Sequence, residues 1–152
     1  MLASIPRKQL DEILFGALQA IYRFERVKVA RFGLTYEQIY LLQFLRRHGP
    51  LAMSDIAAEM KIPLSTATRL IDRMERRRLL SRRQSRGDKR SRIVSIAANG
   101  EHLVRTVEEH TFSVLMANLE GRTDIDVDAI VRTAMQLKEI LHIENVQAKK
   151  ET

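Results

Sequence analysis

Cysteine is absent from this chain of 152 residues. Its absence excludes disulfides, cysteine nucleophiles and every zinc site that needs sulfur ligands. Long apolar runs are missing too, since none approaches the ~20 residues that a helix needs to cross a bilayer. The first residues, MLASIPRKQLDEIL, contain no continuous apolar segment of secretory type. We therefore expect a cytoplasmic protein.

Motifs of catalysis and metal binding are also scarce. The sequence contains no phosphate-binding loop, no G-x-S-x-G and no paired carboxylates placed for acid–base catalysis. His102 and His110 lie two turns apart on one expected helix, too far to share an ion, and His48 and His142 are isolated. We expect no enzymatic activity, no metal and no cofactor.

Acidic residues are scarce relative to basic ones in one segment of the chain, from Lys61 to Arg92. The chain carries a net charge of +7, and between Lys61 and Arg92 twelve Lys or Arg accompany three acids, whereas the rest holds fourteen bases and sixteen acids. Such concentrated positive charge favours a polyanion, either nucleic acid or an acidic membrane surface. A merely solvated basic face would have interspersed acids. Few aromatic residues interrupt the tract, which argues against stacking on single strands.

Hydrophobic residues make up 45% of the chain, enough to bury a sizeable core. Their spacing predicts an α+β fold that is mainly α with a small β-hairpin. The expected helices are Gln9–Arg31, a Thr35-capped segment to Arg47, Asp55–Met60 after a Ser54 cap, Pro63–Arg77, Asn99–Leu119 and Asp126–Glu144, and the expected strands are Ser81–Gln84 and Arg92–Ile96.

Two short helices joined by a tight turn and followed by a hairpin describe a winged helix-turn-helix. We place this lobe at residues 35–97 and a helical dimerisation region at residues 1–34 and 98–152. In the second short helix, one face holds Ala67, Leu70, Ile71 and Met74, and the opposite face holds Ser65, Thr66, Thr68, Arg69, Asp72, Arg73 and Arg76.

The outer face of this helix suits the major groove, which is about 12 Å wide. Arg69 and Arg73, one turn apart, can reach guanine edges. The alternative is that Arg73 and Arg76 pair with neighbouring acids as ordinary solvated surface. The basic hairpin tip cannot enter a core, and beside a groove-reading helix it would lie over the minor groove. The expected DNA-contacting residues are Ser54, Ser65, Thr66, Thr68, Arg69, Arg73, Arg86, Asp88, Lys89 and Arg90.

The segment LIDRMERRRLLSRRQSRGDKRSRIVSIAANGEHLV resembles the helix–wing–helix signature of the MarR family (multiple antibiotic resistance regulators). Asp88-Lys89-Arg90 matches the D-x-R motif of the wing, and Gly100 matches the glycine that opens the next helix. The resemblance implies an obligate homodimer whose first and last helices intertwine and whose two winged lobes read a pseudo-palindrome. It also implies that Arg90 enters the minor groove, that Asp88 orients Arg90, and that Arg69 is a recognition-helix arginine.

This chain departs from the family pattern at four positions around the second short helix and the wing. Lys61 stands at the usual glycine of the turn, Pro63 at the usual polar cap, Arg78 at the glycine after the helix, and Ala97 at the usual capping threonine. A lost cap destabilises by about 1 kcal/mol, so the departures concern local geometry rather than the fold.

The resemblance implies a sequence-specific double-stranded DNA-binding transcription regulator, a ligand-responsive repressor acting as a homodimer on a pseudo-palindromic operator. The alternative is a basic DNA-binding or architectural protein without sequence preference. The family also implies an effector, a small aromatic molecule, in a cleft between the dimer helices and the winged lobe. The residues expected to border this cleft are Tyr22, Phe24, Tyr36, Tyr40, Phe44 and His48. The competing interpretation is that aromatic residues at helical spacing belong to the core.

Overall fold

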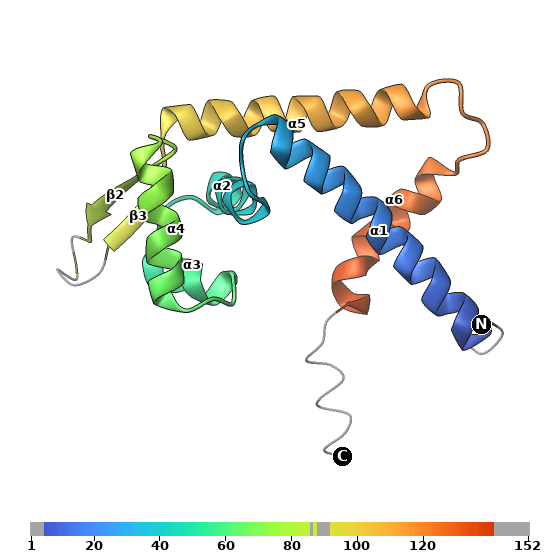
Figure 1. The fold of residues 1–152 in the computed structure, drawn as a ribbon, viewed down its shortest axis with the longest axis horizontal. Coiled ribbons are helices and arrows are strands. Elements are labelled where there is room, and N and C mark those ends of the chain that lie inside the picture. Colours follow the sequence, from blue (N-terminus) through green and yellow to red (C-terminus); the bar gives the residue numbers. More distant parts are fainter. Residues whose placement is uncertain (1–4, 86, 88–91, 142–152) are drawn as a thin grey trace, which may run out of the picture. The chain divides into compact units, whose positions relative to one another are not determined.

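The computed structural model describes residues 5–85, 87 and 92–141 of the chain (Figure 1). The fold is α+β, mainly helical with one small antiparallel sheet, as the sequence predicts. Its elements are α1 (Arg7–Arg31), α2 (Tyr36–His48), β1 (Leu51–Ala52), α3 (Met53–Glu59), α4 (Leu64–Arg76), β2 (Leu80–Gln84), β3 (Arg92–Ile96), α5 (Ala98–Leu119) and α6 (Val127–Ile140). The chain forms two compact units, Met1–Phe112 and Ser113–Thr152.

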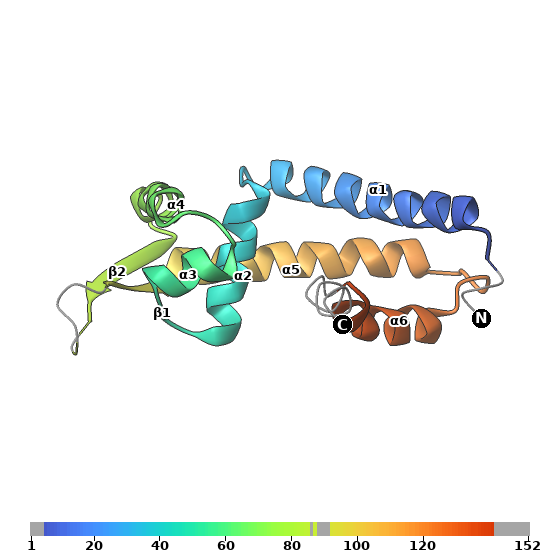
Figure 2. The ribbon, with the colours of Figure 1, turned by 90° about the horizontal axis from the view of Figure 1, so that it is seen from below.

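The sheet contains three strands in the order β1-β3-β2. Both pairings are antiparallel, and Val94 of the central strand lies opposite Leu51 on one side and Arg82 on the other. The two hairpin strands confirm the predicted hairpin, and β1 adds a third strand to it. In two views, α2, α3 and α4 gather around this sheet at the start of α5 (Figure 2).

The core of the first unit lies between the sheet and the surrounding helices. The largest fully buried side chains are Ile39, Leu41, Leu42, Leu45, Ile56, Ile71, Met74, Val94, Val104 and Val107. The predicted inner face of α4 is confirmed, because Ala67, Leu70, Ile71 and Met74 are all buried. In α2, Leu45 is buried whereas Phe44 is only partly covered.

Ion pairs join α2 to α5 within the first unit. The Nε of Arg46 lies 2.9 Å from Glu101 Oε1, and a second guanidinium nitrogen pairs with Glu108. Arg47 Nη2 also lies 3.2 Å from Glu108 Oε1. Glu101 and Glu108 stand two helical turns apart, so one arginine spans both turns and fixes α2 along α5.

The helix caps test the sequence predictions locally. The predicted Thr35 cap of α2 is confirmed and forms a capping box, because the Gln38 N–H donates to Thr35 Oγ1 at 3.3 Å and the Thr35 N–H donates to Gln38 Oε1 at 3.0 Å. The predicted Ser54 cap is wrong. Helix α3 begins one residue before Ser54, and the extended Ala52 takes the cap position without a side-chain hydrogen bond.

Pro63 is also placed one residue differently from the prediction. Its ψ of 145° keeps it outside α4, so it caps the helix rather than forming its first residue. The Pro63 carbonyl accepts hydrogen bonds from the N–H groups of Thr66 and Ala67 at 2.9 and 3.0 Å. The helix therefore starts without a side-chain cap, and the proline carbonyl begins its hydrogen-bond ladder.

The second unit contains the end of α5 and the helix α6. Gly121 ends α5 with a φ of 70°, which confirms the predicted break. Asp126 caps α6 by accepting the Ala129 N–H at 2.9 Å, so α6 begins one residue later than predicted. The predicted end at Glu144 lies outside the described residues. No helix in the described part of the chain is long and apolar enough to span a bilayer.

Candidate nucleic-acid interface

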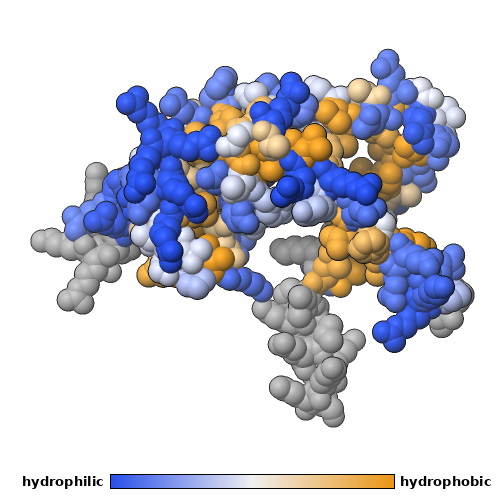
Figure 3. Space-filling model, in the orientation of Figure 1, coloured by the Kyte–Doolittle hydropathy of each residue, from blue (hydrophilic) through white to orange (hydrophobic). Residues whose placement is uncertain are grey.

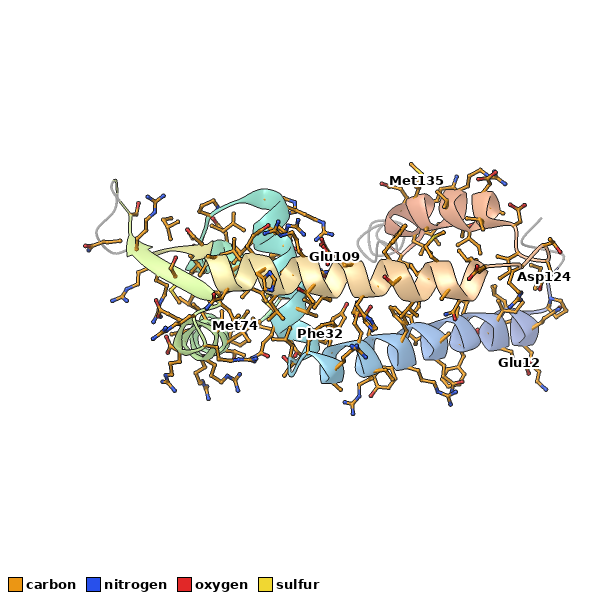
Figure 4. The ribbon with its side chains drawn as sticks, turned by 90° about the horizontal axis from the view of Figure 1, so that it is seen from above. Glu12, Phe32, Met74, Glu109, Asp124 and Met135 are labelled. Atoms are coloured by element: carbon orange, nitrogen blue, oxygen red, sulfur yellow. The ribbon has the colours of Figure 1, made fainter. Side chains whose placement is uncertain are left out.

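Helix α4 is polar and basic on the side that faces away from the core. Ser65, Thr66, Arg69, Arg73 and Arg76 are exposed, and Thr68 is half-buried with its hydroxyl donating to the Leu64 carbonyl at 2.8 Å. Strongly hydrophilic side chains project over this helix (Figure 3), while Met74 lies on its opposite, inward side (Figure 4). The sequence prediction of two opposed faces is therefore confirmed.

The outer side of α4 carries a shallow hollow of about 440 Å³. The residues around it are Thr66, Arg69, Asp72, Arg73 and Arg76. The hollow follows the helix axis, because residues 69, 73 and 76 recur at steps of four and three. One hydroxyl and three guanidinium groups thus face solvent along one side of a single helix, with one carboxylate among them.

The acids of α4 are held by the wing, not by the arginines of their own helix. Arg82 of β2 places Nη1 2.6 Å from Asp72 Oδ1 and donates from Nε to Glu75 Oε2 at 2.9 Å. A further guanidinium nitrogen also contacts Glu75. The hydrogen bond to Glu75 raises the pKa of Arg82, so this side chain stays charged. We call this contact the Arg82 fork.

The Arg82 fork decides between the two interpretations of α4. Because both acids pair with Arg82, the alternative in which Arg73 and Arg76 neutralise them does not occur. Within the described residues, Arg69, Arg73 and Arg76 form no ion pair. Their charges are therefore free to meet an anion. This arrangement was not predicted from the sequence, since the fork joins residues of a helix to a strand that follows it.

The remaining predicted DNA contacts divide into two groups. Ser54 is exposed in the first turn of α3, and no side-chain hydrogen bond caps that helix. The wing strands lead towards the predicted tip. The tip residues Arg86, Asp88, Lys89 and Arg90 lie outside the described residues, so their contribution stays a prediction from the sequence.

A second hollow, here called the α1–α2 groove, lies in the same unit and has a volume of about 660 Å³. It is lined by Leu18, Ile21, Tyr22, Glu25, Arg26, Val29, Ala30, Leu34, Thr35, Tyr36 and Glu37. Of the predicted effector residues, it brings together Tyr22 and Tyr36, which are both more than half exposed. These two tyrosines are therefore not core residues in this chain.

The other predicted effector residues lie outside the α1–α2 groove. Tyr40, Phe44 and His48 continue from Tyr36 along α2 as a stack, with ring centroids 6.5, 6.1 and 4.1 Å apart in order. The Tyr40 hydroxyl donates to Glu59 at 2.6 Å, and this hydrogen bond raises the pKa of Tyr40 to about 12. The ring of Phe24 instead contacts the ammonium of Lys28.

Polar groups of the α1–α2 groove were not foreseen from the sequence. Glu25 forms an ion pair with the buried Lys28 at 2.5 Å, and Arg26 lies over the ring of Tyr22. Glu37 lies in the first turn of α2 and lines the same hollow. No group of three or more potential metal ligands occurs in residues 5–85, 87 and 92–141.

Comparisons with known proteins agree with this geometry. Residues 32–91 match the family model described as MarR family. The uncharacterized HTH-type transcriptional regulator YfiV of Bacillus subtilis is 33% identical over 90 residues, which cover 59% of this chain and 56% of YfiV. The chain thus spans about half the length of the first curated relatives it matches.

Solved structures share the fold over most of the chain. A MarR family protein from Bacillus stearothermophilus superposes with a TM-score of 0.77 at 24% identity, covering 88% of this chain and 94% of that one. A mutant of MepR from S. aureus, solved bound to an oligodeoxyribonucleotide, gives a TM-score of 0.66 at 17% identity and covers 88% and 98% of the two chains. The sequence match over residues 32–91 and these shared folds together show that the winged lobe of this chain is similar to that of MarR family proteins.

Proposed function

We propose that this chain is a transcription regulator that binds double-stranded DNA by sequence. It acts in the cytoplasm as a homodimeric repressor on a pseudo-palindromic operator, and a small ligand modulates it. The observation that carries the proposal is the outer side of α4, where three arginines form no ion pair with a described residue while the Arg82 fork holds the acids. MepR, which shares the fold, is a protein solved with an oligodeoxyribonucleotide, and this supports the same class of partner.

The geometry of α4 suits reading of bases rather than charge attraction alone. A major groove about 12 Å wide admits one helix. Arg69 and Arg73 stand one turn apart on the outer side, and a guanidinium can donate two hydrogen bonds to the O6 and N7 of guanine. Thr66 adds a hydroxyl near the N-terminus of α4, and the N-terminal residues of a recognition helix are the ones that contact base edges.

Exposed apolar residues support the homodimer. In α1, one face presents Ile13, Leu14, Leu18, Ile21 and Tyr22, and in α6 the residues Ile130, Val131, Met135, Leu137 and Ile140 are exposed. Apolar patches of this extent on a soluble protein mark an interface. A twofold axis through such an interface would place two copies of α4 about one DNA turn, ~34 Å, apart.

The rival function is DNA binding without sequence preference, which the local excess of positive charge also favours. Selection of bound duplexes from a random pool separates the two. A sequence-reading homodimer enriches an inverted repeat, whereas a non-specific binder enriches none. An unenriched pool would therefore replace our proposal by the rival.

Replacing Arg69 with alanine is expected to weaken binding to the selected duplex and to blur its preference over a scrambled one. A bidentate arginine–guanine pair contributes about 1–3 kcal/mol of discrimination, which corresponds to roughly 5- to 150-fold per half-site. Fluorescence anisotropy at fixed salt measures both affinities. The control is Arg105→Ala in α5, which removes one charge away from α4. Equal losses on both duplexes would show that Arg69 contacts only phosphates.

The α1–α2 groove is the proposed effector site, with Tyr22 and Tyr36 as ring contacts. We expect at least one member of a panel of small aromatic carboxylates and phenols to release the duplex from the wild-type protein. Tyr36→Ala should raise the half-effective concentration about tenfold, as for the loss of one aromatic contact of about 1.4 kcal/mol. Phe44→Ala, outside the groove, is the control. An equal shift in both variants would place the ligand elsewhere.

A further inference from the structure

Helix α4 is bracketed by two basic residues in an unusual backbone conformation. Lys61, three residues before α4, has a φ of 51°, and Arg78, two residues after it, has a φ of 58°. In the described part of the chain they are the only residues other than glycine with positive φ. Side chains with a Cβ rarely adopt this region, and glycine is the usual residue there.

Both residues occupy the same position in the same helix-ending motif. The Lys61 N–H donates to the Ala58 carbonyl at 3.1 Å and the next N–H, of Ile62, donates to Ala57 at 3.0 Å. At the end of α4, the Arg78 N–H likewise donates to Glu75 at 2.8 Å and the following N–H reaches the Met74 carbonyl at 3.0 Å. This paired pattern is the Schellman motif, whose left-handed position favours glycine.

Neither cation contributes a contact to the described part of the fold. Lys61 and Arg78 are exposed, and neither side chain has a hydrogen bond or an ion pair with a described residue. Arg77 provides the contrast, since its Nη1 donates to the Gly33 carbonyl at 3.0 Å and so ties α4 to the turn after α1. The Schellman motifs need the left-handed backbone at these two positions but not the long cationic side chains, so a strained residue other than glycine there points to function.

The positions of the two cations fit the rims of a DNA groove. Thirteen residues of α4 span about 20 Å at 1.5 Å per residue, and the major groove that would hold the helix is about 12 Å wide between two rows of phosphates. Long side chains at the two ends of α4 can therefore meet opposite strands. Contacts of this kind fix the orientation of a recognition helix.

We propose that Lys61 and Arg78 are phosphate-contacting residues that clamp the two ends of α4 to the DNA backbone, one on each side of the groove. The inference rests on the proposed function, because it assigns further contacts to the same interface. It also explains why residues with long side chains occupy backbone positions that suit glycine. Their charge strengthens DNA binding, while the backbone strain lowers the stability of the fold.

Glycine variants separate these two effects. Lys61→Gly and Arg78→Gly each relieve the positive φ and remove one charge, so we expect the urea midpoint of unfolding to rise in each. Anisotropy measures duplex affinity from 50 to 300 mM salt, on the selected duplex and on a random 30-base-pair duplex. The affinity should fall roughly fivefold at 100 mM salt for each lost contact. The slope of log K against log salt should decrease by about 0.9 per lost phosphate contact in each chain.

Two matched variants complete the experiment. Lys61→Arg keeps both the charge and the backbone strain, so it should keep the wild-type salt slope. Lys8→Gln in α1 removes one charge far in sequence from α4 and should also leave the slope unchanged. A glycine variant that is stabilised but keeps the full salt slope overturns the inference for that residue, while wild-type binding still supports the proposed function. A wild-type protein that binds neither duplex overturns both.

Discussion

Replacing Gly100 with alanine is expected to lower the free energy of unfolding by about 2–3 kcal/mol, the upper range for an overpacked core. A Cβ at this position would lie 2.2 Å from the Leu79 carbonyl oxygen and 3.0 Å from Cγ1 of Ile96. The Leu79 carbonyl cannot retreat freely, because it accepts the Ala97 N–H at 3.0 Å. Urea unfolding followed by circular dichroism measures the loss.

Gly16 of α1 is the matched control for this experiment. A Cβ there meets no atom within 4 Å in the described structure. Alanine in a helix is more favourable than glycine by about 0.5–1 kcal/mol, so Gly16→Ala should stabilise slightly. The two substitutions are chemically identical and opposite in expected sign. If Gly100→Ala stabilised the protein as well, the close approach of α5 to Leu79 would be refuted.

We expect the junction at Gly100 to affect the proposed DNA binding as well. Here β3 ends and α5 begins, and the first turn of α5 presses against the residue that precedes β2. A displaced Leu79 would move β2, and with β2 the Arg82 fork that holds the acids of α4. We therefore expect the Gly100→Ala protein to bind the selected duplex more weakly than wild type even after its affinity is corrected for the fraction of the protein that is folded.

Replacing Leu14 with glutamate is expected to convert the proposed homodimer into monomers. Leu14 is 55% exposed in the single chain and lies on the apolar face of α1. Covering such a side chain contributes about 1.5–3 kcal/mol, and a twofold interface loses two of them. The dissociation constant should rise at least a hundredfold, since 3 kcal/mol corresponds to roughly 150-fold. Sedimentation equilibrium over a range of concentrations measures it.

Gln19→Glu supplies the control for charge, because Gln19 lies on the opposite, polar side of α1 and is also exposed. It should leave the association unchanged. The monomeric Leu14→Glu protein should also lose most of its affinity for an inverted repeat, yet keep weak binding to one half-site. A wild-type protein that sediments as a monomer at all concentrations would contradict the homodimer.

Much of the lobe could be predicted from the sequence because its signals are local. The inner face of α4 follows from the spacing of four apolar residues, from Ala67 to Met74, and the capping box of α2 follows from Thr35 and Gln38 alone. Each pattern depends on the helical period or on hydrogen bonds three residues apart, so neighbours in the chain suffice to specify it.

Local signals were less reliable where neighbouring residues could each take the same role, as at the start of α3. Ser54 is a favourable cap by residue type, yet the strand pairing of Leu51 and Ala52 with β3 makes α3 begin one residue earlier. Pairing with a strand about 40 residues away thus overrides the local preference. The aromatic residues of α2 show the same limit: their spacing is regular, but only Tyr36 borders the α1–α2 groove.

What the amino-acid sequence determined by itself is the order of the elements, the two faces of α4 and the concentration of charge around it. Only the tertiary structure decided that Asp72 and Glu75 belong to Arg82, that Lys61 and Arg78 have positive φ, and that Gly100 lies against Leu79. The physical reason is range. Periodicity and caps act over one or two helical turns, whereas an ion pair between a helix and a strand, or the space left for a Cβ, depends on how separate elements pack.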